Sequence, residues 1–533
     1  MKKKKFGHLS FLIWLIMVGL CCSCNHRESH VRSEAVIDRR PNKIGAEKHR
    51  PLYHFTPKKN WVNDPNGLVY VDGEYHLFYQ YHPFSSVWGP MHWGHAVSED
   101  LIHWKELDIA LYPDSLGYIY SGSAVYDSLN TSGLGTINNP PMIALFTYHD
   151  MEIFESGGEP YQYQGLAHST DKGRTWEKYA HNPIIKNPGS KDFRDPKIFW
   201  FEKTKEWIAL IASKDHVKFY SSPNLLDWTL KSEFGKDQGQ HGTGVWECPD
   251  LFPLPVDKSG EIKWVLIQNI NEEGPNGGSG TQYFIGDFDG CRFVNHNPKS
   301  TVLWLDYGKD NFAGNTWNNS TRRIFIGWMS NWQYAQQVPT ETWKNGMTFP
   351  RELSLKKTAV GIRLVSSPIR EIERLYTHKH LKYTHLKFGD TIQLDFPIKA
   401  IEIQGSVLGK PLGDFELKFV NDLGEELVIA YHKSEKEFSV DRTQSGITDF
   451  SEHFPVVQTA SRISVSSTVT FKLLMDSNST EAFFDGGEVV LSSLHYPTKP
   501  YTSIVLESKD SGIELKELWI RPLSVGDNTE ISP

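Results

Sequence analysis

The sequence predicts an all-β protein in which a five-bladed β-propeller is followed by a C-terminal β-sandwich. The first part of the chain repeats a group of short strand-like runs about every 60 residues. The second part alternates apolar and polar residues without that spacing. Because 533 residues exceed one ordinary hydrophobic core, two domains are expected.

The composition excludes several classes of protein. Hydrophobic residues make up 39% of the chain and aromatic residues 13%, enough apolar surface for folded cores, which excludes a disordered chain. A net charge of -8 without any basic block argues against nucleic acid as a partner. A mean hydropathy of -0.44 excludes a membrane protein with several spans.

The N-terminus is predicted to be an export signal. Lysines at positions 2–5 precede an apolar run over 9–20, which is shorter than the roughly 20 residues that a spanning helix needs. Cys24 after Ser23 resembles a bacterial lipobox, which implies cleavage before Cys24 and its lipidation; an ordinary secretory signal is the alternative. We therefore expect a signal peptide at 1–23, a flexible tether at 24–50 and a lipid-anchored protein in the periplasm or on the cell surface.

The propeller prediction covers residues 51–350. Five apolar runs share one pattern and begin at residues 75, 142, 207, 264 and 324. A propeller blade buries its faces only against neighbouring blades, so a repeat of several short strands is typical of this fold. Val71-Asp72-Gly73-Glu74 predicts a two-residue hairpin loop inside the first unit. A β-sandwich with irregular loops remains the alternative.

The repeat stops near residue 350. We expect a linker at 351–381 with a short helix over 369–381, and then the β-sandwich at 382–533. Cys248 and Cys291 are the cysteines left after the signal peptide, so at most one disulfide can form in the body of the protein.

Three acidic residues occupy equivalent places in the repeat. Asp64-Pro65, Asp195-Pro196 and Glu247-Cys248-Pro249 each stand just before the first strand of a unit. Equivalent positions in successive blades face the same axis, so the three carboxylates should converge at one mouth of the channel. Proline after an acid disfavours α geometry and interrupts ladder pairing, which lets the side chain face the cavity.

Each of these motifs alone also has an ordinary explanation, namely a turn, a surface ion pair or a solvated acid. Three crowded carboxylates cannot all ionise without cost, so their pKa values must separate. Such a set suits glycoside hydrolysis, which needs one carboxylate nucleophile and one protonated acid. The sequence has no HExxH motif and no complete calcium loop, so neither metal nor cofactor is predicted.

Several motifs occur in the order found in one enzyme family. They closely resemble the signatures of glycoside hydrolase family 32, the β-fructofuranosidases, over roughly residues 51–523; Val62 stands where this family usually has Met. The motifs are Trp61–Gly67, Tyr120–Ser123, Phe193–Pro196, Trp246–Pro249, Trp328–Trp332, Ser439–Arg442 and Phe483–Gly487.

The resemblance implies a role for each matching residue. Asp64 would be the nucleophile, Glu247 the general acid and base, and Asp195 the stabiliser of the transition state, with retention through a fructosyl-enzyme. Arg194 should keep Asp195 charged, and the apolar wall around Trp246 should raise the affinity of Glu247 for its proton. The substrate-binding residues implied, with structural packing as the alternative for several, are Asn63, Gln80, Trp88, Ser123, Arg194 and Trp332.

The sequence therefore predicts an enzyme that releases fructose from β-2,6 or β-2,1 linked fructans, with sucrose as a further substrate. The segment 280–290 resembles exo-acting members and favours exo cleavage over endo cleavage. A fructan-binding lipoprotein without activity and a fructosyltransferase are the alternatives. Neither nucleic acid nor an obligatory protein partner is expected.

Overall fold

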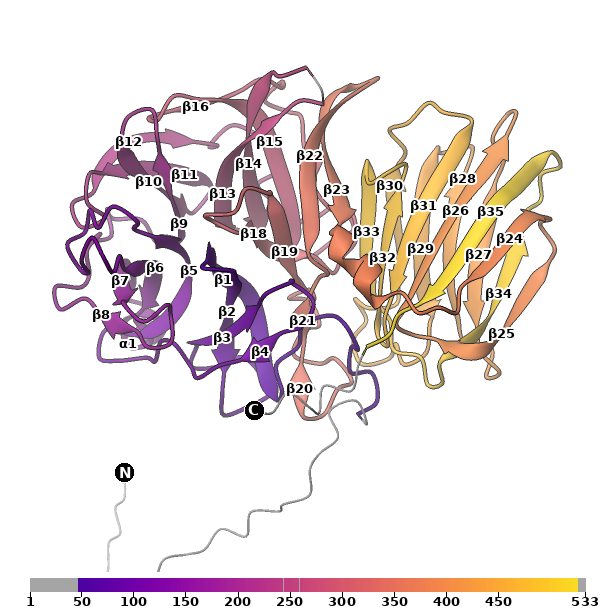
Figure 1. Cartoon of the computed structure of the whole chain (residues 1–533), viewed down its shortest axis with the longest axis horizontal. Coiled ribbons are helices and arrows are strands. Elements are labelled where there is room, and N and C mark those ends of the chain that lie inside the picture. Colours follow the sequence, from indigo (N-terminus) through magenta and orange to yellow (C-terminus); the bar gives the residue numbers. More distant parts are fainter. Residues whose placement is uncertain (1–46, 243, 258, 526–533) are drawn as a thin grey trace, which may run out of the picture. The chain divides into compact units, whose positions relative to one another are not determined.

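The computed structural model describes residues 47–242, 244–257 and 259–525 (Figure 1). The predicted signal peptide, Cys24 and most of the predicted tether lie outside these ranges. The predicted all-β class is confirmed, because helical structure in the described chain is confined to α1 (Met151–Glu155) and the 3-10 helix η1 (Arg370–Leu375). Neither of these is long and apolar enough to cross a bilayer.

The strands from β1 to β23 form five sheets that follow one another around a common centre (Figure 1). The first sheet contains β1 (Asn60–Val71), β2 (Glu74–His82), β3 (His92–Ser98), β4 (Lys105–Glu106) and β20 (Trp343–Lys344). The second contains β5 (Tyr118–Tyr126), β6 (Met142–His149), β7 (Gln162–Ser169) and β8 (Glu177–Lys178). The third contains β9 (Arg194–Phe201), β10 (Glu206–Ser213), β11 (His216–Ser222) and β12 (Thr229–Phe234).

Two further sheets complete this part of the chain. The fourth contains β13 (Trp246–Pro255), β14 (Ile262–Ile270), β15 (Gly280–Phe288), β16 (Phe293–Asn295) and β17 (Leu303–Trp304). The fifth contains β18 (Phe312–Thr316), β19 (Ile324–Met329), β21 (Gly346–Met347), β22 (Arg351–Thr358) and β23 (Gly361–Pro368). We interpret the five sheets as propeller blades, and the number of blades stays a prediction.

The predicted hairpin in the first sheet is present. Val71 pairs with Glu74 across the turn between β1 and β2. Asp72 and Gly73 both have positive φ, 50° and 91°, as a two-residue type I′ turn requires.

The first strand of each of the five sheets contains a β-bulge. Against its neighbour, each of these strands has one extra residue near the centre of the molecule, and β1 has a second one between Asn66 and Val69. A bulge redirects side chains out of the regular alternation of a strand. The residues inside the five bulges are Asn63-Asp64, Ser121, Asp195-Pro196, Cys248-Pro249 and Ala313-Gly314.

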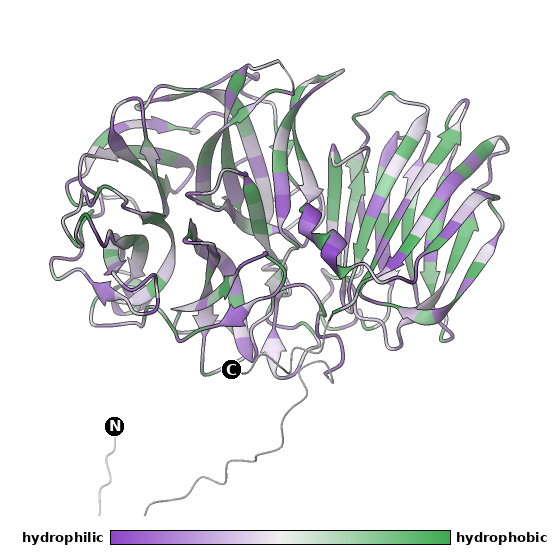
Figure 2. Ribbon diagram, viewed as in Figure 1, coloured by the Kyte–Doolittle hydropathy of each residue, from purple (hydrophilic) through white to green (hydrophobic). Residues whose placement is uncertain are grey.

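The C-terminal β-sandwich consists of two six-stranded antiparallel sheets. One contains, in spatial order, β24 (Leu381–Leu386), β35 (Ile513–Pro522), β26 (Ile401–Gly409), β31 (Thr468–Met475), β32 (Ser479–Phe484) and β33 (Val489–Leu494). The other contains β25 (Thr391–Ile398), β34 (Tyr501–Glu507), β27 (Phe415–Val420), β28 (Glu426–His432), β29 (Glu437–Gln444) and β30 (Val457–Ser461). Apolar residues alternate along these strands, and the buried ones form one core cluster that draws on both sheets (Figure 2).

Two predicted segments differ from the structure. Residues 351–368, expected in a linker, form β22 and β23 of the fifth sheet, because Leu353 and Leu355 are buried between exposed or half-buried polar neighbours. The expected helix over 369–381 is reduced to η1, since β24 already begins at Leu381. The end of the predicted tether is also packed, because Arg50 is buried and donates hydrogen bonds to the carbonyl groups of Pro57 and Lys58.

A buried polar network joins the five-sheet part to the sandwich. Arg351 forms ion pairs with Asp306 and with Glu481 of β32, and all three side chains are fully buried. His54 lies between Glu481 and Asp476, at 2.9 and 2.8 Å. Charges buried this deeply need their partners, so the network fixes one arrangement of the two parts.

Candidate active site

A cavity of about 430 Å³ opens where the five bulged strands meet. It has the size of a small-molecule site and mixes carboxylate, amide and aromatic side chains. Each of the five sheets, or a segment that connects its strands, contributes lining residues to the cavity. The lining residues are Asn63, Asp64, Gln80, Trp88, Tyr120, Ser121, His149, Phe154, Tyr161, Gln162, Asp192, Arg194, Asp195, Glu247, Asn271, Glu272, Phe312, Trp332 and Gln336.

The structure brings the three predicted carboxylates together in this cavity. Asp64 and Asp195 lie inside the bulges of their strands, and Glu247 lies directly before its bulge. All three are therefore within the strands and not before them, as the sequence predicts, because the ladder continues on both sides of the inserted residues. Asp195 has a φ of 60°, in the left-handed region, which costs a non-glycine residue about 1–2 kcal/mol. Its backbone N–H donates to Thr147 Oγ1 at 2.9 Å and thereby holds this conformation.

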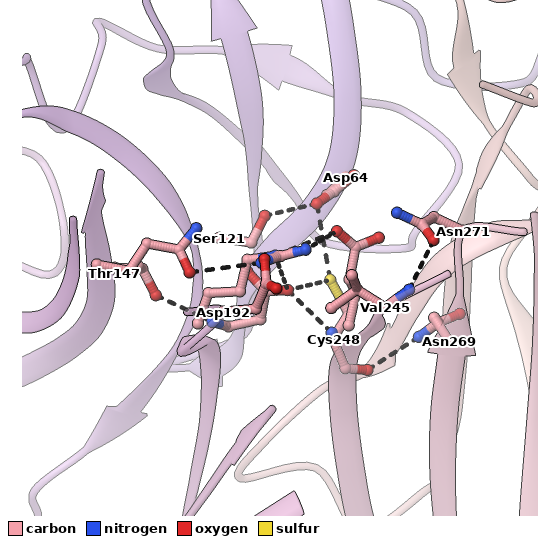
Figure 3. A network of polar contacts seen from close by, with 12 residues as sticks. Asp64, Ser121, Thr147, Asp192, Val245, Cys248, Asn269 and Asn271 are labelled. Atoms are coloured by element: carbon pink, nitrogen blue, oxygen red, sulfur yellow. Dashed lines mark hydrogen bonds and ion pairs between the residues drawn. The ribbon is translucent and has the colours of Figure 1, made fainter. Parts of the chain in front are cut away.

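Asp64 accepts a hydrogen bond at each carboxylate oxygen. Asn63 Nδ2 donates to Oδ1 at 3.0 Å. Ser121 Oγ donates to Oδ2 at 2.7 Å (Figure 3). Trp61 Nε1 in turn donates to Asn63 Oδ1 at 2.7 Å, which orients the amide. These donors fix the orientation of the carboxylate in the cavity.

Glu247 forms an ion pair with Arg194. Two nitrogens of the guanidinium, Nε and Nη2, lie 3.1 and 2.7 Å from Glu247 Oε1, and Nη1 donates to Asp192 Oδ1 at 2.7 Å. The distance from Arg194 Nε to Asp195 Oδ2 is longer, 3.9 Å. The expectation that Arg194 keeps Asp195 charged is therefore corrected: the guanidinium bonds Asp192 and Glu247, and the pKa of Asp195 is raised although Arg194 opposes the shift.

Asp195 receives its hydrogen bonds from Cys248 instead. The backbone N–H of Cys248 donates to Asp195 Oδ2 at 3.1 Å. Its thiol lies 3.6 Å from that oxygen and 3.6 Å from Asp64 Oδ2, so one sulfur contacts two carboxylates (Figure 3). Burial raises the pKa of this thiol well above its usual range. Cys248 is free, as is the exposed Cys291, so the two do not form a disulfide.

The pKa values of two carboxyl groups are raised. Burial raises the pKa of Asp195 to about 7; Arg194 opposes the shift, and the charges of Glu247 and Asp64 add to it. Burial also raises the pKa of Glu247, again opposed by Arg194 and supported by Asp64. Several buried carboxyl groups thus share one guanidinium, and the cluster keeps a proton near neutral pH.

Most predicted substrate-binding residues line the cavity, namely Asn63, Gln80, Trp88, Arg194 and Trp332. Gln80 is 2% exposed, and its amide nitrogen has no hydrogen-bond partner within the protein, which leaves a buried donor for a ligand.

Ser123 does not line the cavity. Its hydroxyl donates to the Pro196 carbonyl at 2.8 Å and accepts from the Ile198 N–H at 2.8 Å. These two hydrogen bonds hold β9, the strand that carries Asp195, in place. Ser121, two residues earlier in the same motif, contacts Asp64 instead.

Sequence reasoning missed one whole wall of the cavity. Tyr120 stacks on His149 with ring centroids 4.3 Å apart, and Phe154 and Tyr161 continue this aromatic wall. Only Tyr120 of these four residues stands in one of the motifs, and the sequence assigned it no role; Ser121 and Phe312 could have been found as the counterparts of the acids in the second and fifth units. Among the described residues, no group of three or more His, Cys, Asp or Glu side chains could hold a metal ion.

Comparisons with known proteins identify the family. The family model "Glycosyl hydrolases family 32 N-terminal domain" matches residues 54–368, and its C-terminal counterpart matches residues 371–522. The chain is 45% identical to a levanase of Bacillus subtilis (strain 168), covering 90% of this chain and 71% of the levanase. It is 37% identical to an extracellular exo-inulinase of Aspergillus niger, covering 85% and 90%.

Solved structures agree with this match. The exo-inulinase of Aspergillus awamori superimposes with a TM-score of 0.83 at 34% identity, covering 90% of this chain and 99% of that one. The β-fructofuranosidase of Schwanniomyces occidentalis, complexed with fructosyl-erythritol, gives 0.80 at 31% identity, covering 90% and 98%. The resemblance inferred from the motifs is thereby confirmed: the chain belongs to glycosyl hydrolase family 32.

Proposed function

We propose that the protein hydrolyses β-fructans of the levan or inulin type and releases fructose from the chain end, with retention of configuration. The observation that carries this proposal is the convergence of Asp64, Asp195 and Glu247 in one cavity with a retained proton. The levanase and exo-inulinases among the relatives support the substrate class.

In the first step, Asp64 attacks the anomeric carbon of the terminal fructosyl unit while Glu247 protonates the leaving oxygen. Asp64 is the suitable nucleophile because its hydrogen bonds from Ser121 and Asn63 fix the orientation of its carboxylate in the cavity. In the second step, Glu247 takes a proton from water, which attacks the fructosyl ester and frees Asp64.

Asp195 is proposed to bind ring hydroxyls and to stabilise positive charge on the sugar. Hydrogen bonds donated by these hydroxyls favour its charged form and lower its pKa. The shared proton then passes to Glu247, which needs it as the acid. The pKa values of Asp195 and Glu247 are both raised in the free protein. Substrate binding thus makes Asp195 the charged stabiliser and Glu247 the protonated acid.

Export and anchoring are part of the proposal. An apolar run after four lysines and the lipobox-like Cys24 support a lipoprotein signal. The named extracellular location of the Aspergillus relative supports export. We infer that the mature enzyme is attached to a bacterial membrane through Cys24 and meets its substrate outside the cytoplasm.

Chromatography of the early products from levan and inulin tests the activity, the linkage and the mode of cleavage together. The proposal predicts fructose as the first product, and oligosaccharides as first products would indicate endo cleavage. Binding of levan with no reducing sugar formed would contradict the proposal and favour a binding protein.

A further inference from the structure

A loop of the fourth sheet connects the cavity to the sandwich. It spans residues 271–279, directly after β14. Asn271 and Glu272 at its start line the cavity, whereas Asn276 at its tip contacts the sandwich. One short segment therefore touches both the proposed reaction site and the second domain.

The tip is held by three hydrogen bonds from a single side chain. Asn276 Oδ1 accepts from the Thr459 N–H at 2.9 Å, and Nδ2 donates to the Thr459 carbonyl at 3.0 Å and to the Tyr307 carbonyl at 2.6 Å. Thr459 lies in β30, the edge strand of its sheet. At this edge of the sheet the amide bonds the backbone groups of Thr459 that a neighbouring strand would otherwise bond. Both its oxygen and its nitrogen form hydrogen bonds.

The loop is compact: hydrogen bonds close its tip, and the pairing of Ile270 with Gly280 in the ladder between β14 and β15 closes its base. The Gly274 N–H donates to the Gly278 carbonyl at 2.7 Å, and the Gly277 N–H donates to the Gly274 carbonyl at 2.9 Å. A Cβ atom at Gly278 would lie 2.2 Å from Asn331 Oδ1, and its φ is 73°, so only glycine fits here. Such a compact segment transmits a displacement of its tip to its base.

The base of the loop lies beside the proposed acid. Glu247 pairs with Asn269, and Asn271 Oδ1 accepts from the Val245 N–H at 2.9 Å (Figure 3). The side of the cavity next to the acid receives the leaving group, since the acid protonates the leaving oxygen. Asn271 and Glu272 are therefore placed to contact the part of the fructan that follows the cleaved bond.

We propose that Asn276 is a positioning residue: by fastening the loop to β30, it holds Asn271 and Glu272 where they bind the leaving sugar chain. This inference rests on the proposed fructan hydrolysis and assigns the sandwich a role in recognising the leaving group. The fructosyl unit is proposed to contact Asp64 and Asp195, neither of which belongs to the loop.

The test compares Asn276→Ala with Asn421→Ala. Asn421 is a matched control because its amide also bonds backbone groups, at Lys499, Leu423 and Glu425, within the sandwich and away from the cavity. The substrates are fructo-oligosaccharides and methyl β-D-fructofuranoside, whose methanol leaving group is too small to reach the loop.

For Asn276→Ala, kcat/KM for the oligosaccharides is expected to fall about threefold to tenfold, mainly through KM. The methyl fructoside should be hydrolysed as by the wild type, and Asn421→Ala should leave both substrates unchanged. Asn276→Asp, which keeps only the accepted bond, should act in the same direction. An equal loss on both substrates, or no loss on either, would overturn the positioning role.

Calorimetric binding of the oligosaccharides to Asp64→Asn, with and without Asn276→Ala, separates the two proposals. Weaker oligosaccharide binding in the double variant supports the positioning role. If the wild type hydrolyses nothing, that result refutes the proposed function and leaves the positioning role standing. Unchanged binding together with an active wild type refutes the positioning role alone.

Discussion

Arg194 donates two hydrogen bonds to one oxygen of Glu247, at 3.1 and 2.7 Å, and the same guanidinium also binds Asp192. The proposed acid is therefore in direct contact with a positive charge that lowers its pKa, while burial and nearby carboxylates raise it. The balance between these effects sets the pH range in which Glu247 holds its proton.

Asp192→Asn should move the alkaline limb of the pH–activity profile to lower pH. The charge of Asp192 raises the pKa of Glu247, so its removal lowers that pKa, and the acid loses its proton at lower pH. The profile of kcat/KM against pH measures this shift. Asp114→Asn, outside the cavity, serves as the control, and an alkaline limb that stays in place would contradict the role given to Asp192.

Ser121→Ala should reduce activity, whereas Ser123→Ala should reduce stability. Ser121 donates to the nucleophile, so its loss should reduce kcat/KM about tenfold, the value of one hydrogen bond to a charged group, and leave the unfolding temperature unchanged. Ser123 bonds two buried backbone groups, so its loss should lower stability by about 1–3 kcal/mol. Denaturant unfolding and fructose release separate the two, and a larger activity loss for Ser123→Ala would contradict the geometry.

Arg351→Met should destabilise the contact with the sandwich by about 3–5 kcal/mol, because Asp306 and Glu481 would remain buried without their cation. Arg322→Met is the matched control. Arg322 pairs with Glu352 and Glu371 at a partly exposed site, where such pairs contribute about 1 kcal/mol or less. Equal unfolding free energies for the two variants would show that the buried network does not fix the interface.

His54 should make the stability fall at alkaline pH. Burial alone lowers its pKa, but the hydrogen bonds and charges of Asp476 and Glu481 outweigh this and raise it from 6.5 to about 9. Because the folded state holds the proton more tightly, this contribution is complete below pH 6.5 and is lost as the pH rises through 9.

The resulting difference reaches about 3 kcal/mol. It is measured as the unfolding free energy of wild type and His54→Gln between pH 6 and pH 10. The two curves should converge as the pH rises, and parallel curves would show that His54 is not protonated in the folded protein.

The sequence revealed the all-β fold, the hairpin at Asp72-Gly73 and the convergence of the three acids, since each follows from local composition and a repeat. It misplaced the acids relative to their strands, because a bulge depends on pairing with the next strand. It also predicted a linker where β22 and β23 are found, although buried and exposed residues begin to alternate directly after Pro350.

The partner of Arg194 and the aromatic wall at Phe154 could not be found in the sequence. Arg194 and Glu247 are 53 residues apart and meet only when the third and fourth sheets pack side by side. Tyr120 and His149 likewise come together only through the pairing of β5 with β6. Contacts of this kind are determined by tertiary packing and leave no local pattern.

Asp64 is expected to become covalently linked to fructose during turnover. Rapid acid quenching of the wild-type enzyme with levan or inulin, followed by peptic digestion and mass spectrometry, tests it directly. We expect one added fructosyl group on the peptide that contains Asp64, and none in Asp64→Asn, which should also release no fructose. A fructosyl group on a different peptide, or fructose release at the wild-type rate by Asp64→Asn, would contradict it.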